Sequence, residues 1–485
     1  MHKRTVHLAL LTCSLLALTA CGTNTQVDLA SAPPKIEPGF RPQSATAADV
    51  WVTHPDRSRL ISWDGTKNFV SDGNVTPSTL TINESQTFQT MEGFGASLTD
   101  SAGWLMWNKM SATQRNSLMQ SLFGFNDGNA GISFLRIPLG GSDMALSHYT
   151  YNDGAADPNL TRFSIVHDLT YIVPLAKQAK TINSSLRYMG TPWSPPAWMK
   201  TSGSLNSGKL KPEHYQTYAN YLRKTFDAYN AQGVKFNYLS PQNEPQYEPG
   251  SYPGTKFEWY DELNFVRGHL FNTMNGTGVK ILTLDHNWDL EWYPRAVLNE
   301  GSAYYEGTAW HCYAGNNAAM SRVRDAFPSK GVYLTECSGG LWATNFGDNM
   351  KWNMQNLFIG GTKNWAKTVL FWSLALDPSG GPHLGGCSNC RGVVSINQNG
   401  GAVTFNEEYY AIAHFARFVW PGAVRIGTTD SSDGKFIGVA FRNTNGAKAL
   451  VVLNQSNSTA TFKMVWNGKS IQQSLPASGV ATVFW

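Results

Sequence analysis

The stretch EHYQTYANYLRKTFDAYNAQGVKFNYLSPQNEP, residues 213–245, contains an expected helix, the strand that follows it and the polar segment after that strand. Glu213–Ala231 has the spacing of apolar side chains that predicts an amphipathic helix, and Val234–Ser240 is a short apolar run that predicts a buried strand. A polar segment that contains Glu244 follows this strand at once. Short buried strands that alternate with amphipathic helices are typical of parallel sheets covered by helices.

The same alternation occurs eight times between residues 87 and 420. The expected strand–helix pairs are Thr87–Ala96 with Ala102–Phe123, Ile132–Leu139 with Ile165–Thr181, Leu186–Thr191 with Glu213–Ala231, Val234–Ser240 with Phe257–Met274, Val279–Asp285 with Tyr293–Asn299, Thr308–Tyr313 with Ala318–Phe327, Gly331–Thr335 with Asn349–Phe358, and Trp365–Ala375 with Glu407–Val419. Eight pairs favour a closed (β/α)8 barrel over an open sheet. We therefore predict an α/β fold with its functional site at the carboxyl ends of the barrel strands.

Both flanks of the barrel segment are rich in β runs and have no helical pattern. Residues 421–485 alternate short β runs with turns of Asn, Gly and Ser, and residues 46–86 also have the pattern of strands and turns. We predict that the two flanks pair in one antiparallel β-sandwich domain, appended to a barrel over residues 87–420.

The composition limits the classes of protein to which the chain can belong. Charged residues make up 15% of the 485 residues, against about 25% in an ordinary soluble domain. An aromatic content of 12% excludes a disordered chain, and a net charge of +4 is too small to indicate a nucleic-acid binder.

The N-terminus has the pattern of an export signal. A charged start and an apolar run to Ala20 predict a signal peptide over residues 1–20. Small residues before Cys21 resemble a bacterial lipoprotein cleavage site, so we expect Cys21 to carry a lipid that anchors the exported protein to the cell envelope. Residues 21–45, rich in Pro, Ser and Thr, would be the tether. A plain signal peptide with an incidental Cys is the alternative.

Four cysteines remain in the body of the chain, Cys312, Cys337, Cys387 and Cys390. Cys387 and Cys390 are separated by two residues in a Gly-rich loop, and in an exported protein a local disulfide is the expected state. Zinc is the alternative, but the sequence has no second CxxC and no HxxxH pair, so no metal is expected.

Two glutamates stand immediately after expected strands. Glu244 follows the fourth strand, and Glu336 follows the seventh. Hydrolysis of a glycosidic bond needs one carboxyl group that protonates the leaving oxygen and a second that attacks the anomeric carbon or activates water. For either glutamate alone, an ion pair with a nearby Arg is an equally good interpretation. Because both lie at the mouth of one barrel, together they favour glycoside hydrolysis.

Seven motifs along the barrel resemble those of glycoside hydrolase family 30, which includes glucosylceramidases and endo-β-1,6-glucanases. They are EGFGASLTDSA (92–102), LRIPLGGSD (135–143), TPWSPPAWMK (191–200), NEP (243–245), HCY (311–313), YLTEC (333–337) and FWSLALD (371–377). The resemblance covers roughly residues 46–485. It implies a barrel with an attached sandwich, cleavage with retention of configuration, and no metal or organic cofactor.

The resemblance also implies roles for individual side chains. Glu244 matches the acid/base, whose surroundings are expected to raise its pKa, and Glu336 matches the nucleophile, about 5–5.5 Å away. Arg136 and Tyr313 would hold the charge of Glu336, and Asn243 would contact the sugar 2-hydroxyl. The remaining substrate-binding candidates are Asp143, Trp193, Trp372 and His311, with Asp100 as a weaker one. The alternatives are burial in the core for the two Trp residues and a structural role for His311.

The substrate is expected to be a β-linked glucan or glucoside. The segment QNEPQYEPGSYPG (242–254) is similar to the β-1,6-glucanase branch, whereas Cys312 stands where the glucosylceramidase branch more often has an aromatic residue. One alternative is a xylan-active member that uses Arg391 to bind a glucuronate carboxylate. Another is a surface glycan-binding lipoprotein without catalysis, which would need neither Glu244 nor Glu336.

Overall fold

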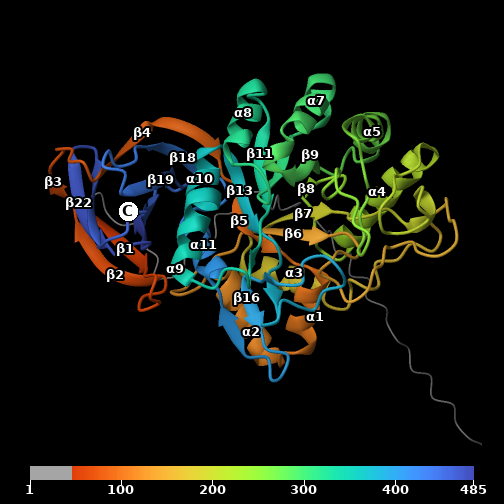
Figure 1. Cartoon of the computed structure of the whole chain (residues 1–485), viewed down its shortest axis with the longest axis horizontal. Helices are drawn as coiled ribbons and strands as arrows, with labels where there is room; N and C mark the ends of the chain where they lie inside the picture. The colour runs from red at the N-terminus through yellow and green to blue at the C-terminus, as the bar shows by residue number, and fades with distance from the viewer. Residues whose placement is uncertain (1–45) are drawn as a thin grey trace, which may run out of the picture. The chain divides into compact units, whose positions relative to one another are not determined.

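A computed structural model describes residues 46–485, so the expected signal peptide, Cys21 and the tether lie outside the described residues. Eight parallel strands close into a barrel, as predicted (Figure 1). In chain order they are β5 (Gly93–Ser97), β6 (Phe134–Pro138), β7 (Arg187–Thr191), β8 (Tyr238–Leu239), β9 (Lys280–Asn287), β10 (Gly307–His311), β11 (Gly331–Glu336) and β13 (Ala366–Phe371).

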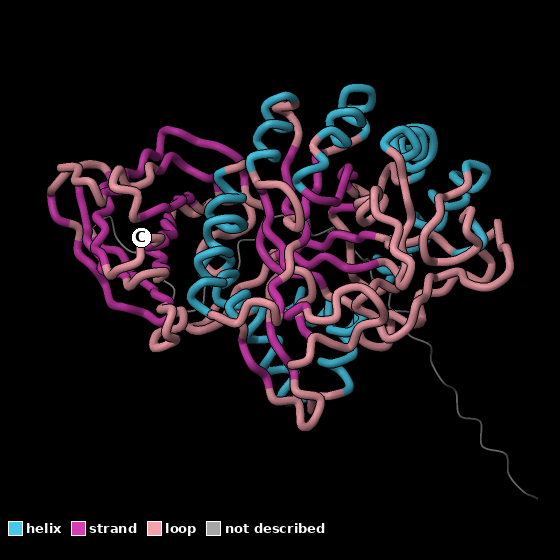
Figure 2. The backbone as a smooth tube through the Cα atoms, in the orientation of Figure 1, coloured by secondary structure: helices cyan, strands magenta, loops and turns pink. Residues whose placement is uncertain are grey.

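Helices lie outside these strands, as the cyan and magenta segments of Figure 2 show. They are α1 (Asp100–Asn108), α2 (Ala112–Phe123), α3 (Ile172–Ile182), α4 (Tyr215–Ala231), α5 (Trp259–Phe265), α6 (Phe271–Thr273), α7 (Trp292–Gly301), α8 (Ala318–Ala326), α9 (Phe346–Asn353), α10 (Ile359–Lys363) and α11 (Glu407–Ala416). A π turn joins α5 to α6, and a second joins α9 to α10.

The single helix expected over Ala102–Phe123 is wrong, because the structure has two helices there. The second begins after Ser111, whose side chain accepts a hydrogen bond from the Gln114 backbone N–H while the Gln114 side chain accepts one from the Ser111 N–H. This reciprocal capping box satisfies two N–H groups at a helix start, and it therefore favours a new helix at this position.

The first expected strand, Thr87–Ala96, is also divided. Its first half belongs to β4 (Thr79–Thr90), which pairs with strands of the second sheet, and the barrel strand begins only at Gly93. Gly95 allows this strand to approach β6 closely, since a Cβ there would lie 2.0 Å from the Phe134 carbonyl oxygen.

A cluster of buried hydrophobic side chains lies among the barrel strands. Seven of the eight strands each contribute one buried residue to it, namely Phe134, Met189, Tyr238, Leu282, Ala309, Tyr333 and Leu370. A packed interior of this kind leaves the carboxyl ends of the strands as the place where a site can form.

The second sheet contains strands from both ends of the described chain, as predicted. Its order is β2-β1-β23-β20-β19-β18-β4-β21-β22-β3. These strands are β1 (Ala47–Thr53), β2 (Ser62–Asn68), β3 (Val70–Ser71), β4, β18 (Val424–Thr428), β19 (Phe436–Arg442), β20 (Lys448–Asn454), β21 (Ala460–Trp466), β22 (Lys469–Leu475) and β23 (Val480–Phe484). In Figure 1 the red and orange strands lie beside the blue ones, and β1 pairs directly with β23.

Short strands and two disulfides stabilise the loops that follow β10, β11 and β13. The short strands are β12 (Gly339–Gly340), β14 (Ala375–Leu376), β15 (Cys390–Arg391), β16 (Val394–Ile396) and β17 (Val403–Phe405). One disulfide joins Cys387 to Cys390, and the other joins Cys312 to Cys337, a pair that was not predicted from the sequence.

Among residues 46–485, no helix has the length and apolar character that crossing a membrane requires.

Candidate active site

A cavity of about 520 Å³ opens at the carboxyl ends of the barrel strands. Seven of the nine side chains expected in the site line it, namely Asp143, Trp193, Asn243, Glu244, Tyr313, Glu336 and Trp372. The other two, Arg136 and His311, are fully buried and contact these lining residues directly.

Glu336, the last residue of β11, is held by two of the expected partners. An Arg136 guanidinium nitrogen lies 2.5 Å from Glu336 Oε2, and the Tyr313 hydroxyl donates to Glu336 Oε1 at 2.8 Å. Because Arg136 is buried beside it, the ion pair acts in a medium of low dielectric and holds the Glu336 side chain in place.

Arg136 has a second carboxylate partner, Asp285, which the sequence analysis did not select. The guanidinium donates to Asp285 Oδ2 at 2.8 Å and to Asn243 Oδ1 at 2.7 Å. Burial alone would lower the Arg136 pKa, but the charges of Asp285 and Glu336 raise it above its ordinary value. For Asp285, burial raises the pKa, but the Arg136 charge and the His311 hydrogen bond outweigh it, so the net direction is down.

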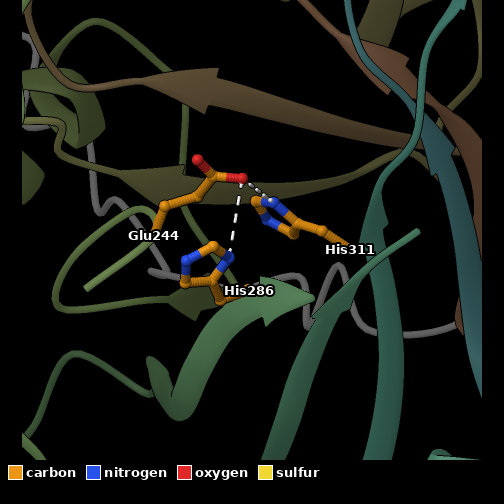
Figure 3. Close-up of side chains that lie close together, drawn as sticks. All are labelled: Glu244, His286 and His311. Atoms are coloured by element: carbon orange, nitrogen blue, oxygen red, sulfur yellow. Dashed lines mark hydrogen bonds and ion pairs between the residues drawn. The ribbon is translucent and has the colours of Figure 1, made fainter. Parts of the chain in front are cut away.

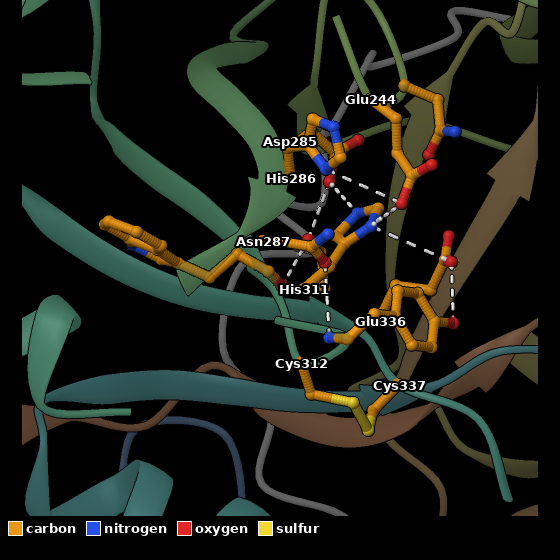
Figure 4. A network of polar contacts seen from close by, with 12 residues as sticks. Glu244, Asp285, His286, Asn287, His311, Cys312, Glu336 and Cys337 are labelled. Carbon is orange, nitrogen blue, oxygen red and sulfur yellow. Dashed lines mark hydrogen bonds and ion pairs between the residues drawn. A yellow bond between two sulfur atoms is a disulfide. The ribbon is translucent and has the colours of Figure 1, made fainter. Parts of the chain in front are cut away.

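Glu244 lies across the mouth from Glu336, and His311 lies between them. His311 Nδ1 is 3.1 Å from Glu244 Oε1 and 3.7 Å from Glu336 Oε1, while its Nε2 is 3.0 Å from Asp285 Oδ1 (Figure 4). Glu244 Oε1 and Glu336 Oε1 both lie close to His311 Nδ1. The distance between these two oxygens therefore cannot exceed the sum of 3.1 and 3.7 Å. A second histidine, His286, places its Nδ1 3.6 Å from Glu244 Oε1 (Figure 3).

The backbone around Glu244 is in a conformation that L-residues rarely adopt. Its φ is 44°, and that of Asp285, whose carbonyl accepts the Glu244 N–H at 3.0 Å, is 53°. Left-handed conformations of residues other than glycine cost about 1–3 kcal/mol each and cluster at functional sites. The folded barrel maintains this conformation, which positions the Glu244 side chain at the cavity.

The expected rise in the Glu244 pKa is wrong for the free protein. Burial raises this pKa, but the His311 hydrogen bond and the charges of His286, His311 and Arg136 lower it below its ordinary value. Burial lowers the pKa of His311, but the neighbouring carboxylates, Glu336 first among them, raise it to about 9. At neutral pH the proton shared by Glu244 and His311 therefore resides on the imidazole, one hydrogen bond away from Glu244 Oε1.

Asp143, Trp193 and Trp372 form the inner wall of the cavity. The two indole rings stack at 5.1 Å, and the Arg136 guanidinium carbon lies 4.9 Å from the Trp193 ring centre. Burial, together with the charges of Glu336 and Glu244, raises the Asp143 pKa to about 7. A carboxyl group next to flat aromatic faces can bind a sugar hydroxyl group while the rings contact the sugar face.

Two further candidates have structural partners. Asp100, at the start of α1, accepts hydrogen bonds from the Tyr171 hydroxyl at 2.5 Å and the Leu146 N–H at 2.9 Å, and does not line the cavity. Arg391 is buried and pairs with Glu407 at 2.6 Å and Glu408 at 2.7 Å. Its charge is therefore already compensated within the protein.

Glu244, His286 and His311 offer three possible ligand atoms that lie within 4.8 Å of one another. This donor set has the residue types of a zinc site. Both ring nitrogens of His311 are, however, hydrogen-bonded to carboxylates, which favours a proton between His311 and Glu244 over a metal.

Three features of the site were not predicted from the sequence, namely Asp285, His286 and the Cys312–Cys337 disulfide. Asp285 and His286 lie at the end of the fifth barrel strand, so the rule that selected Glu244 and Glu336 also applies to them. The disulfide joins the residue before Tyr313 to the residue after Glu336 (Figure 4). Cysteine spacing did not indicate this pair, because its members lie 25 positions apart in the sequence.

Comparison with known proteins agrees with this architecture. Residues 91–419 match the family model of the glycosyl hydrolase family 30 TIM-barrel domain, and residues 422–483 match that of the family 30 beta sandwich domain. An endo-1,6-beta-D-glucanase of Aspergillus fumigatus is 32% identical over 80% of this chain and 84% of its own length. An endo-1,6-beta-D-glucanase of Trichoderma harzianum is 30% identical over 92% of this chain and 94% of its own length.

A solved structure, the endo-beta1,6-glucanase BT3312, superposes with a TM-score of 0.84 at 31% identity, covering 91% of this chain and 99% of that one. The barrel, the sandwich, the sequence similarity and the full-length coverage lead to one conclusion. The chain belongs to glycoside hydrolase family 30, a family of retaining glycosidases.

Proposed function

We propose that this glycoside hydrolase cleaves β-1,6-linked glucan through a covalent glycosyl-enzyme, with Glu336 as nucleophile and Glu244 as acid/base. The observation that carries the roles is the placement of both carboxylates around His311 Nδ1, at 3.1 and 3.7 Å, on opposite sides of one cavity. Family membership supports retention, which requires such a pair on either side of the scissile bond.

In the first step a Glu336 oxygen bonds to the anomeric carbon, and the bond from that carbon to the glycosidic oxygen breaks. The proton on His311 Nδ1 passes to Glu244 Oε1 across their 3.1 Å contact, and Glu244 delivers this same proton to the leaving oxygen, which leaves Glu244 as a carboxylate. In the second step water attacks the anomeric carbon, Glu244 accepts the water proton and returns it to His311, and the bond from that carbon to Glu336 breaks, which releases Glu336 as a carboxylate. Arg136 and Tyr313 hold Glu336 in place throughout.

The structure and the relatives support a neutral glucan as the substrate. The relatives described above are named for endo-1,6-beta-glucanase activity. The residues that line the cavity include no Lys or Arg. Arg391, the candidate for a glucuronate site, is paired with Glu407 and Glu408, which disfavours glucuronoxylan.

The substrate is tested by incubating the purified protein with β-1,6-glucan, β-1,3-glucan, glucosylceramide and glucuronoxylan. We expect β-1,6-glucan to be shortened to oligosaccharides and glucuronoxylan to remain intact, with products read by chromatography and mass spectrometry. Release of xylo-oligosaccharides without attack on β-1,6-glucan would overturn this proposal.

The Glu244–His311 pair predicts the alkaline limb of the pH profile. A raised histidine pKa means that the proton is present below about pH 9 and is lost as the pH rises through that value. We expect kcat/KM for an aryl β-glucoside to fall there, and His311→Asn to move the fall toward acid pH, because Asn cannot hold the proton. The control is His54→Asn, at a partly buried loop histidine that does not line the cavity. Identical profiles for His311→Asn and the wild type would contradict this role.

A further inference from the structure

A second cavity, of about 380 Å³, continues from the candidate active site. The two share Tyr313, Ser338 and Trp342 in their walls, so a chain that leaves the first cavity along these residues enters the second. We call this second cavity the side groove. Its volume falls in the range of small-molecule sites, about 300–1,000 Å³.

Two exposed tryptophans line the side groove. Trp342 is 58% exposed and Trp352 is 43% exposed. The Trp342 ring packs against the backbone of Gly340, where a Cβ would lie 1.9 Å from a ring carbon. One part of this indole is therefore fixed against β12 while much of the ring remains exposed. Large exposed aromatic rings beside a cavity are typical of ligand contact surfaces.

A buried amide in the groove wall has no hydrogen-bond partner. Asn353, at the end of α9, is 4% exposed, and its Nδ2 makes no hydrogen bond. Asn349, one turn earlier, donates to the Ala343 carbonyl and to Glu407. An unpaired buried donor costs about 1–3 kcal/mol, so the polar side chain at this point of the groove wall does not serve the stability of the fold.

The charges of the groove match a neutral ligand. Arg391, the sole cation among the lining residues, donates to Glu408 through two nitrogens and pairs with Glu407. Asp348 adds a carboxylate acceptor. Exposed ring faces, polar amide side chains in the wall and carboxylate acceptors together suit a polyhydroxylated, uncharged molecule.

The walls of the groove are cross-linked. Gly339 and Gly340 of β12 pair with Arg391 and Cys390 of β15, Cys387–Cys390 closes the neighbouring loop, and Cys312 lines the groove while bonded to Cys337. A wall that is already ordered loses little conformational entropy when a ligand binds.

We propose that the side groove binds a further sugar unit of the same β-glucan chain, outside the cavity in which cleavage occurs. The sugar contacts the Trp342 and Trp352 faces, beside the wall that contains Asn353. This inference rests on the proposed function, because it requires a substrate that occupies the first cavity at the same time.

The test measures how affinity depends on chain length. In a Glu336→Gln background, which binds without turnover, calorimetry compares a β-1,6-linked glucose disaccharide with a hexasaccharide. We expect Trp352→Ala to weaken hexasaccharide binding about tenfold, as for loss of a buried aromatic contact, and to leave disaccharide binding as it was. Trp63→Ala is the matched control, since Trp63 is 55% exposed on β2 of the sandwich sheet.

A second variant, Asn353→Leu, separates ligand binding from folding. Removing the unpaired buried amide nitrogen should leave the unfolding temperature unchanged or raise it, whereas an apolar side chain in the groove wall should still weaken hexasaccharide binding. If Trp352→Ala and Asn353→Leu bind the hexasaccharide as tightly as Trp63→Ala does, the side groove is not a sugar site. If the Glu336→Gln protein binds neither oligosaccharide and the wild type cleaves no β-glucan, the proposed function itself fails.

Discussion

Glu336→Gln is expected to lower kcat for an aryl β-glucoside by at least about 10⁴-fold, as removal of a catalytic nucleophile does in other hydrolases. The amide is a far weaker nucleophile than the carboxylate, so the covalent intermediate does not form. The fold should persist, because Arg136 keeps Asp285 at 2.8 Å and Asn243 at 2.7 Å as partners. Steady-state kinetics and circular dichroism measure the two effects.

The matched control for this variant is Glu306→Gln. Glu306 immediately precedes β10 (Gly307–His311), at the opposite end of the strand from the cavity, and pairs with Lys280 at 2.8 Å. We expect this variant to retain wild-type turnover. Undiminished turnover by correctly folded Glu336→Gln protein would show that Glu336 is not the nucleophile.

Glu244→Ala should reduce kcat on ordinary β-glucosides by about 10²–10⁴-fold, because both proton transfers lose their group. With a dinitrophenyl β-glucoside, whose leaving group needs no proton, the first step should proceed and the glycosyl-enzyme should accumulate. Azide is then expected to enter the space vacated by the carboxylate and to restore turnover, giving the β-glycosyl azide. The product configuration is read by proton NMR.

Glu248→Ala serves as the control for the azide experiment. Glu248 is an exposed carboxylate of the same loop, and its Oε1 accepts the Gly208 N–H at 3.0 Å. We expect no loss of turnover and no response to azide in this variant. Formation of the α-azide by Glu244→Ala would contradict retention at this site, and an absence of rescue would contradict the acid/base role.

Much of the barrel and the two glutamates were predictable from local sequence. Glu244 and Glu336 each follow a short apolar run, and parallel strands of one barrel bring their carboxyl ends together. The same reasoning did not reach Asp285 and His286, although they end the fifth barrel strand, because the resemblance motifs did not include that segment. Polar residues at the carboxyl end of any barrel strand are therefore candidates for the active site, whether or not they belong to a family motif.

The boundaries of the first strand and first helix were predicted less well. Thr87–Ala96 reads as one β run, yet β4 and β5 belong to different sheets, and only pairing in three dimensions divides them. The capping box at Ser111 and Gln114 was a local signal for a second helix within Ala102–Phe123. That boundary was therefore available from the sequence itself.

The sequence by itself determined the fold class, the two-ended sandwich and the residues whose chemistry suits the reaction. Periodicity and strand-end position depend on neighbouring residues, so they are readable along the chain. Only the tertiary structure decided which charges lie together. Glu244, His311, Asp285, Arg136 and Glu336 come from five strands or the loops that follow them, and their mutual distances set the location of the proton. A glutamate expected to hold that proton alone instead shares it with a histidine 67 residues away, because pKa values depend on charges in space and on burial.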